Sequence, residues 1–282
     1  MKTLIVGSTS VIGRACGRKL EMDGDVKFAG RRDADISVDL TRWDQLPEIN
    51  ERFDVVIHAA ADFGGTSGDD IVRAELVNAV GTASVCRLAQ AVEASHLVIV
   101  SSISACYQPS DPFYGIYSLS KRHAEEVAQL FCSVIGLPLA ILRPSQIYDD
   151  EGGCRRHQPL LYHMVDRAQA GEDIVVYGKH DAVRNYLHIE DLSEICRLVV
   201  RQRLTGCHSC SSPNSVRLSE IASTAFSIFG RGGGVRFQPD KPDVADLPDI
   251  DLGVLYDVLN YRPQVNLREG MARIKTYREA HS

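Results

Sequence analysis

The chain has 282 residues, of which 44% are hydrophobic and 24% are charged. Its 31 basic and 37 acidic residues give a formal net charge of −6, and no long basic run is present, so neither a nucleic-acid-binding nor an anionic-membrane surface is indicated. No apolar stretch approaches the ~20 residues that span a bilayer. The short run after Met1 predicts a buried strand and not a signal peptide. The length allows one large α/β domain or a domain with a smaller lobe.

Eight cysteines are scattered through apolar and helical settings, which favours a reducing, cytoplasmic location. Cys207-His208-Ser209-Cys210 offers three soft ligands. No second Cys/His cluster stands at a spacing that would complete a tetrahedral zinc site. We therefore expect structural thiols and no metal.

In the first half of the chain, apolar runs alternate with helical patterns. The runs bounded by turn signals predict buried strands at 4–7, 26–30, 55–58, 97–100 and 139–142. The segments between them predict helices at 11–23, 42–52, 70–94 and 115–135. This alternation predicts a parallel, doubly wound sheet.

After Arg143-Pro144 the alternation loosens. The remaining patterns predict a helix at 157–170, a strand at 174–177, an apolar segment at 186–202, a helix at 217–229, a strand at 235–238 and a helix at 267–280. We therefore expect an α/β fold: a Rossmann-type dinucleotide-binding domain from 1–143 and about 182–205, and a smaller substrate-binding lobe from about 144–181 and 206–282.

The segment Gly7-Ser8-Thr9-Ser10-Val11-Ile12-Gly13 follows a strand and opens a helix, the context in which a glycine-rich turn binds phosphate. Gly7 permits the tight turn, Gly13 allows the helix to pack closely on the sheet, and the helix N-terminus contributes positive potential. Ser10 replaces the usual middle glycine. A purely structural turn remains the alternative.

The end of the second strand gives a prediction about the cofactor. Where an acidic residue would bind the ribose 2′-hydroxyl of NAD, the chain has Gly30-Arg31-Arg32. Two guanidinium groups at this place could clamp a 2′-phosphate, which favours NADP(H) and leaves NAD(H) possible. Asp39, after a short strand-like segment at 36–38, is placed to accept a hydrogen bond from the adenine amino group.

Tyr117 and Lys121 stand four apart within a predicted helix, so they share one face. A free phenol titrates near ~10. A nearby cation favours the phenolate, which moves the group toward the range of efficient acid–base catalysis. The spacing alone is common on surface helices. Together with the glycine-rich turn, it indicates nicotinamide redox chemistry.

These features resemble the extended short-chain dehydrogenase/reductase family, also known as the NAD-dependent epimerase/dehydratase family, whose members mostly act on nucleotide sugars. The resemblance covers nearly the whole chain. It also rests on His58-Ala59-Ala60-Ala61, Val77-Asn78-Ala79-Val80-Gly81-Thr82, Ser101-Ser102, Leu142-Arg143-Pro144-Ser145-Gln146-Ile147-Tyr148 and Arg184-Asn185-Tyr186-Leu187-His188-Ile189-Glu190-Asp191-Leu192. It implies cofactor contacts from Gly7, Ser10, Val11, Ile12, Gly13, Arg31, Arg32, Asp39, Leu40, Ala59, Ala60, Ala61, Asn78, Lys121 and Pro144.

The resemblance also implies catalytic roles. Tyr117 would be the acid or base, Lys121 would bind the nicotinamide ribose and lower the tyrosine pKa, and Ser102 would hydrogen-bond the substrate oxygen. Ser101 or Ser104 could take the place of Ser102, and Ser104 is also a candidate for substrate contact.

Two further candidates for substrate binding follow from the resemblance. Arg184 matches a position that contacts the diphosphate of a sugar nucleotide, with a surface ion pair to Asp181 or Glu190 as the alternative. His157 matches an acid–base histidine. We expect His188 to be a hydrogen-bonded strand histidine.

The family's dehydratases carry an Asp-Glu pair directly after the strand-end hydroxyl residue, whereas this chain has Ile103-Ser104-Ala105, so dehydration is set aside. Arg31-Arg32 and the short chain favour NADPH-dependent reduction of a nucleotide-linked 4-keto-6-deoxy sugar over epimerisation with a retained NAD. Ala60-Ala61-Asp62-Phe63-Gly64-Gly65 is similar to the GDP-fucose synthase branch. Cys106, however, lies further from Ser102 than that branch's epimerising cysteine would.

A non-catalytic, dinucleotide-binding redox sensor is a second alternative. Such proteins usually lose the tyrosine or the lysine, and this chain keeps both. The resemblance further implies a homodimer, formed through a four-helix interface by the helices near 70–94 and 115–135.

Overall fold

The computed structural model describes residues 1–248 and 254–281. By contacts among its described residues, the chain divides into two compact units. The first comprises Met1–Pro144, Ser193–Cys210 and Gly253–Tyr261, and the second comprises Ser145–Leu192, Ser211–Leu252 and Arg262–Ser282. This division differs from the sequence-based one at three places, because 182–192 group with the second unit, whereas 206–210 and 254–261 group with the first.

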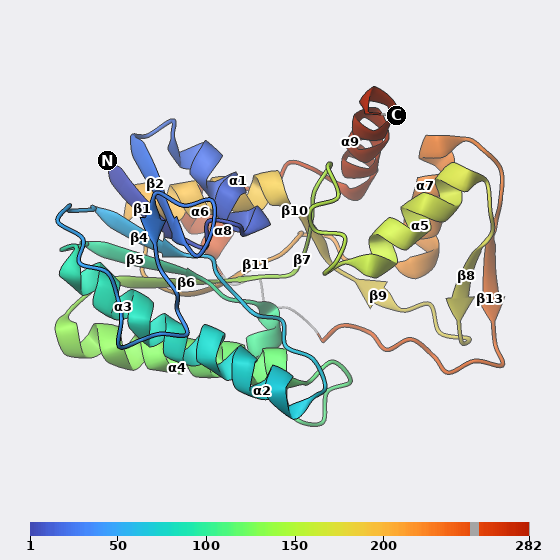
Figure 1. The fold of residues 1–282 in the computed structure, drawn as a ribbon. Helices are drawn as coiled ribbons and strands as arrows, with labels where there is room; N and C mark the ends of the chain where they lie inside the picture. The colour runs from blue at the N-terminus through green and yellow to red at the C-terminus, as the bar shows by residue number, and fades with distance from the viewer. Residues whose placement is uncertain (249–253, 282) are drawn as a thin grey trace. The chain divides into compact units, whose positions relative to one another are not determined.

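A seven-stranded parallel sheet forms the centre of the first unit, in the order β11-β6-β5-β4-β1-β2-β3 (Figure 1). Its strands are β1 (Lys2–Val6), β2 (Asp25–Gly30), β3 (Ile36–Ser37), β4 (Val55–His58), β5 (His96–Val100), β6 (Leu139–Pro144) and β11 (Gly206–Cys210). The strand order reverses beside β1, which pairs with both β2 and β4. Ligands of open α/β sheets bind at such a switch point, beyond the carboxyl ends of the strands.

Helices cover both faces of this sheet. Figure 1 shows α3 and α4 on one face and α1 and α6 on the other. The helices with residues in this unit are α1 (Val11–Leu20), α2 (Gly68–Glu75), the π-helical η1 (Leu76–Val80), α3 (Gly81–Ala91), the 3₁₀ turn η2 (Ile103–Cys106), α4 (Ile116–Ile135), α6 (Ile189–Gln202) and α8 (Leu255–Leu259). Fully buried side chains such as Leu4, Val56 and Leu97 fill the core against Val85 and Leu88 of α3. Because their burial removes apolar surface from water, these contacts stabilise the sheet and its helices as one layer structure.

Most of the predicted elements of this unit are confirmed, and two need correction. The helix expected at 42–52 is wrong, because that segment has turns and then extended chain. Pro47 has no N–H to donate within a helix, and Leu46 and Ile49 pack against the core instead. The helix expected at 70–94 is interrupted by the π-helical segment Leu76–Val80.

The second unit contains small sheets and a group of helices. Its two-stranded sheets are β10 (Tyr186–His188) with β7 (Gln146–Tyr148), β12 (Val216–Arg217) with β9 (Val183–Arg184), and β13 (Val235–Gln238) with β8 (Ile174–Tyr177). The helix α7 (Leu218–Phe229) packs against α5 (Pro159–Ala170) and α9 (Leu267–Ala280). The predicted strands at 174–177 and 235–238 and the predicted helix at 267–280 are confirmed.

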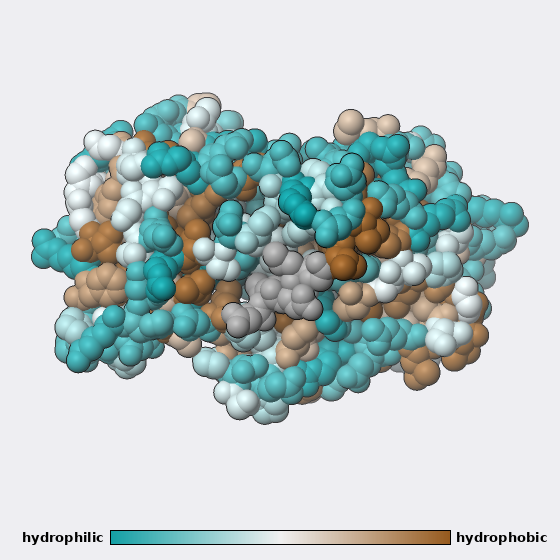
Figure 2. All heavy atoms as spheres, turned by 180° about the vertical axis from the view of Figure 1, so that it is seen from behind, coloured by the Kyte–Doolittle hydropathy of each residue, from teal (hydrophilic) through white to brown (hydrophobic). Residues whose placement is uncertain are grey.

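Every helix within the described residues is too short or too polar to cross a bilayer. Hydrophilic side chains dominate the face drawn in Figure 2, and hydrophobic ones form separate small groups on it. Among the described residues, no group of three or more His, Cys, Asp or Glu side chains could hold a metal ion. All eight cysteines are free thiols.

Candidate active site

In the turn between β1 and α1, glycines allow neighbouring backbone segments to approach each other closely. Gly7 has φ 120°, and a Cβ there would lie 2.7 Å from the backbone nitrogen of Ala60. A Cβ at Gly13 would lie 3.0 Å from the carbonyl oxygen of Gly7. Ser10 caps α1, since its Oγ accepts from the N–H of Gly13 at 3.1 Å. The helix N-terminus and this glycine cradle lie at the switch point of the sheet, where they fit the pyrophosphate of a dinucleotide.

Two residues that sequence reasoning missed join this turn to the end of β2. The hydroxyl of Ser8 donates to the carbonyl oxygen of Arg32 at 2.5 Å. The guanidinium of Arg14 donates to the carbonyl oxygens of Ser8 and Asp33, the latter at 2.6 Å. The only signal in the sequence was their position, with Ser8 inside the glycine-rich segment and Arg14 directly after it. The phosphate turn and the loop after β2 are thereby held together.

The side chains expected to select the cofactor lie in this loop. Arg31 and Arg32 are exposed directly after β2. Asp39 Oδ1 accepts from the backbone N–H and the hydroxyl of Thr41, at 3.0 and 2.7 Å. The hydrogen bond from Thr41, followed by the nearby guanidinium of Arg31, lowers the pKa of Asp39. The loop therefore presents two cations beside one firmly ionised carboxylate.

The other expected cofactor residues differ in exposure. Leu40, Ala59 and Pro144 are buried, whereas Val11, Ile12, Ala60 and Ala61 are half-buried. Asn78 is 1% exposed and its bonds are with the protein: its amide nitrogen donates to Asp62 O and Ser120 Oγ, at 2.7 and 2.9 Å, and its oxygen accepts from Asp62 N at 2.8 Å. Asn78 therefore anchors the loop after β4 to the start of α4.

The structure brings Ser102, Tyr117 and Lys121 together. Tyr117 and Lys121 occupy successive turns at the start of α4, and Ser102 follows the end of β5. The Ser102 side chain is close enough to the Tyr117 phenol to favour its ionised form. The Lys121 Nζ donates to the carbonyl oxygen of Val100 at 3.0 Å and lies 6.0 Å from the centroid of the Tyr117 ring. This arrangement can hold a carbonyl oxygen between a phenol and a hydroxyl.

The protonation of these groups differs from the sequence-based expectation. Burial raises the pKa of Tyr117 to about 12, opposed by the neighbouring side chain of Ser102. Burial lowers the pKa of Lys121 to about 8, opposed by the charge of Glu125. The expected lowering of the tyrosine pKa by Lys121 is therefore not seen, because burial outweighs it. Tyr117 holds its proton at neutral pH.

The three candidate hydroxyls have different partners. Ser101 is 4% exposed and its Oγ donates to Glu125 Oε1 at 2.5 Å. Ser104 accepts from Ser102 at 3.1 Å between hydroxyl oxygens. Among the three, Ser102 is the hydroxyl that acts on the pKa of Tyr117.

An aromatic neighbour of Tyr117 was also missed. The ring of Phe63 stacks on that of Tyr117, with centroids 4.8 Å apart and an angle of 14° between the ring planes. Phe63 belongs to the loop that Asn78 anchors, and at Gly64, with φ 69°, a Cβ would lie 2.4 Å from Ile116 Cγ2. No local pattern indicates this contact, because it joins segments more than 50 residues apart.

In the second unit, Arg184 is 4% exposed, and its guanidinium donates to the carbonyl oxygens of Val183 and Ala245, at 2.7 and 2.8 Å. The alternative of a surface ion pair is wrong: Asp181 instead accepts from Ser219 at 2.5 Å, and Glu190 pairs with Arg273 at 2.5 Å. The cause is the burial of β9 against 245–247, which removes Arg184 from the surface.

The two histidines singled out in the sequence, His157 and His188, have distinct surroundings. Burial lowers the pKa of His157, which precedes α5. His188 on β10 is 2% exposed, and its Nε2 lies 2.9 Å from Asp150 Oδ1, which confirms the prediction of a hydrogen-bonded strand histidine.

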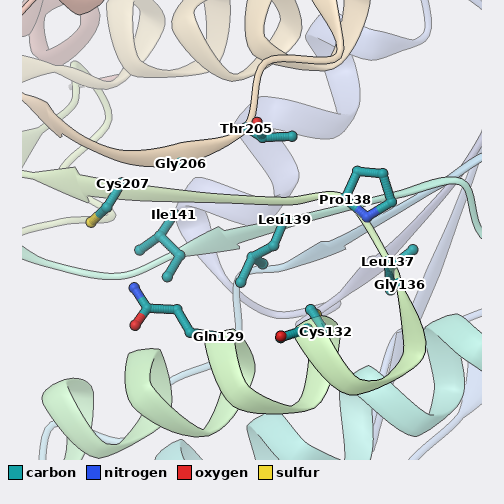
Figure 3. Close-up of a pocket in the computed structure, with 11 residues that line it drawn as sticks. Gln129, Cys132, Gly136, Leu137, Pro138, Leu139, Ile141, Thr205, Gly206 and Cys207 are labelled. Carbon is teal, nitrogen blue, oxygen red and sulfur yellow. The ribbon is translucent and has the colours of Figure 1, made fainter.

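A pocket of about 500 Å³ lies elsewhere in the first unit (Figure 3). Leu139 and Ile141 of β6, Cys207 of β11 and the last turns of α4 line it. These are the amino-terminal halves of the strands, whereas Gly7 and Ser102 follow carboxyl ends. The pocket therefore lies at the amino-terminal ends of the strands, whereas the Ser-Tyr-Lys group lies at their carboxyl ends.

Comparison with known proteins gives a family match. A family model described as "NAD dependent epimerase/dehydratase family" matches residues 3–208. A dTDP-4-dehydro-6-deoxy-D-allose reductase of a Streptomyces species is 28% identical over 170 residues, which are 58% of this chain and 51% of that protein. The chain thus spans about half the length of this reductase and of a second one from Streptomyces bikiniensis. GDP-L-fucose synthase 1 of Arabidopsis thaliana is 23% identical over 300 residues, covering 96% of this chain and 91% of that protein.

Solved structures show the same fold. UDP-N-acetylglucosamine 4-epimerase from Bacillus cereus has a TM-score of 0.79 at 18% identity, covering 98% of this chain and 96% of that one. RMD from Pseudomonas aeruginosa, complexed with NADPH, has a TM-score of 0.80 at 16% identity over 100% of both chains. The expected Rossmann-type fold is thereby confirmed.

Proposed function

The chain belongs to the NAD dependent epimerase/dehydratase family, and we propose that it reduces the 4-keto group of a nucleotide-linked 4-keto-6-deoxy sugar with NADPH. The observation that carries this proposal is the group of Ser102, Tyr117 and Lys121, in which the phenol lies beside the serine and keeps its proton because it is buried. A protonated phenol suits reduction, since the developing alkoxide needs a proton. Ser102 is followed by Ile103-Ser104-Ala105, so no carboxylate directly after it could eliminate water.

The proposed chemistry assigns one task to each side chain. The dinucleotide, when bound at the glycine cradle, supplies the hydride that adds to C4 of the sugar. Tyr117 donates its proton to the C4 oxygen, so that the ketone becomes an alcohol, and the phenolate regains a proton from solvent. Ser102 orients the same oxygen by a hydrogen bond, and Lys121 holds the nicotinamide ribose.

The preference for NADPH rests on the loop after β2. Arg31 and Arg32 are exposed there, and planar guanidinium groups bind phosphate oxygens in bidentate fashion. Asp39 keeps its charge through Thr41 and remains able to accept from an adenine amino group. These features support recognition of a 2′-phosphate.

We propose that Arg184 contacts the diphosphate and that His157 and Ser104 contact the sugar. The relatives named as reductases of 4-dehydro-6-deoxy sugars support this substrate class.

A homodimer and a cytoplasmic location are further parts of this proposal. Exposed apolar side chains lie on α2 and η1 (Ile71, Val72 and Leu76) and on α4 (Leu130 and Val134). Such side chains favour association of these helices with a second copy of the chain. The eight free thiols support a reducing compartment.

The test begins with mass spectrometry of any small molecule that denaturation releases from the purified protein. NADP(H), or no bound cofactor, is the expected result, whereas tightly retained NAD would indicate the epimerase instead. NADPH oxidation is then followed with dTDP-, GDP- and UDP-linked 4-keto-6-deoxy sugars. Absence of NADPH oxidation with all of them would refute the reductase.

A further inference from the structure

Two consecutive residues at the end of β5 each bond to a different side chain of α4. The carbonyl oxygen of Val100 accepts from Lys121 at 3.0 Å. The hydroxyl of Ser101 donates to Glu125 Oε1 at 2.5 Å. The next residue, Ser102, neighbours the phenol of Tyr117. Since the three helix residues are spaced by four, they lie on one face, and the strand end is hydrogen-bonded to that face at two points.

The contact between Ser101 and Glu125 is the more strongly restrained of the two. Glu125 is 3% exposed and accepts from the guanidinium of Arg143 at 2.5 to 3.1 Å. Arg143 is on β6, which pairs with β5, and the N–H of Ser101 donates to the carbonyl oxygen of Leu142 at 2.7 Å. Glu125 thus joins both strands to α4. It lies beneath the reacting groups, one helical turn beyond Lys121 and two beyond Tyr117.

We propose that Glu125, held by Ser101 and Arg143, is a positioning residue that fixes the end of β5 against α4 and so sets the places of Ser102 and Lys121. The proposal rests on the function proposed above, because it concerns the same Ser-Tyr-Lys group. Bidentate, charge-assisted bonds are directional, so this clamp restricts the strand end more than apolar packing would.

The same carboxylate acts on the charge of Lys121. Burial lowers the pKa of Lys121 to about 8, and the charge of Glu125 opposes that effect. The other groups that face Lys121 are Tyr117 on its own helix and His58 on β4, whose pKa burial lowers to about 3, so that it is neutral. Arg143 on β6 is paired with Glu125. Loss of the Glu125 carboxylate would therefore lower the pKa of Lys121 further. The guanidinium of Arg143, left without its partner, would also lower that pKa.

The variant that tests this role is Glu125→Gln, with Glu126→Gln as its matched control. Both changes remove one negative charge from α4, but Glu126 is exposed. We expect kcat of the Glu125 variant to fall roughly tenfold to a hundredfold, since small misplacements of reacting groups have effects of this order. The alkaline limb of its pH–rate profile should move to lower pH, because Lys121 loses its proton earlier. The Glu126 variant should match the wild type.

A second variant covers the case in which Glu125→Gln does not fold. Ser101→Ala removes one hydrogen bond and keeps both charges, so we expect a lower kcat with an unmoved alkaline limb. The proposal would be overturned if the folded Glu125 variant had the kcat of the wild type. If that variant does not fold, a wild-type kcat in the Ser101 variant would overturn it. Glu125 would then serve only to stabilise the fold through its ion pair.

The titration of Lys121, followed by NMR of isotope-labelled lysine side chains, separates this proposal from the one it rests on. If the wild type reduces no keto sugar, the proposed function fails. A downward shift of the Lys121 titration in Glu125→Gln, absent in Glu126→Gln, would still support the positioning role. An unmoved titration in the folded Glu125 variant would contradict it.

Discussion

The phosphate turn and the catalytic face of α4 lie at the same edge of one sheet, yet they are specified in opposite ways. The turn depends on side chains that are missing, since a Cβ at Gly7 would meet the backbone of Ala60. The catalytic face depends on buried polar side chains that hydrogen-bond to the end of β5, such as Lys121 to Val100 and Glu125 to Ser101. The first region therefore tolerates no added atom, whereas conservative substitutions in the second can separate the role of one group from that of its neighbours.

The largest expected effect is that of Tyr117→Phe. Loss of the phenol proton should reduce kcat by about 10²- to 10⁴-fold, the usual contribution of a positioned acid. NADPH binding should persist, because the phosphate turn is unchanged. Steady-state kinetics with the best keto sugar and a fluorescence titration of NADPH measure the two effects. Tyr114→Phe, a half-buried neighbour, is the control; turnover near the wild-type level in the Tyr117 variant would remove Tyr117 from the mechanism.

Gly7→Ala should have the next largest effect, and on binding instead of chemistry. The φ of 120° and the 2.7 Å approach to Ala60 strain any residue with a Cβ, at a cost of about 1–3 kcal/mol. We expect weak dinucleotide binding and a lower melting temperature. Gly68→Ala is the matched control, because no atom lies within 4 Å of its Cβ position. Equal NADPH affinity in the two variants would contradict a close-fitting turn.

A smaller and more selective effect is expected from replacing Arg31 and Arg32 together by Ala. Each charge-assisted hydrogen bond contributes about 1.5–3 kcal/mol, so NADPH affinity should fall tenfold or more while NADH affinity stays constant. The control replaces Arg52 and Arg236 together by Ala, since these exposed arginines, paired with Glu93 and Asp173, carry the same two positive charges. Parallel losses for both cofactors would show that the pair does not read the 2′-phosphate.

The smallest expected effect is that of Phe63→Leu. Aromatic pairs add about 0.5–1.5 kcal/mol beyond buried area, so loss of the stack on Tyr117 should lower kcat a few-fold. Phe113→Leu is a control of similar exposure, 40% against 45%. If the two variants have the same kcat as the wild type, the stack does not orient the phenol.

The sequence predicted those features that depend on local pattern. The strands, the turn at Gly7 and the pair of Tyr117 and Lys121 follow from periodicity and spacing, and the family suggested by the combined motifs is confirmed. The absence of a helix at 42–52 could not be predicted from apolar spacing, because the packing of Leu46 and Ile49 against the core outweighs it.

Other features depend on contacts distant in sequence. Ser101 and Glu125 are 24 residues apart, and the strand register that brings them together appears only in the fold. The raised pKa of Tyr117 likewise has burial as its main cause, and burial is a tertiary property. The stacking of Phe63 on Tyr117 is of the same kind.

The π-helical segment Leu76–Val80 makes the active site sensitive to the length of a helix as well as to its composition. A π-helical turn accommodates more residues than an α-helical turn. An α-helix turns by about 100° per residue. Shortening the segment by one residue would therefore change the rotation of Asn78 relative to one of the two flanking helices. The amide of Asn78 fastens the loop of Phe63 to Ser120, so a single lost peptide unit in this helix would release a loop whose aromatic ring covers Tyr117.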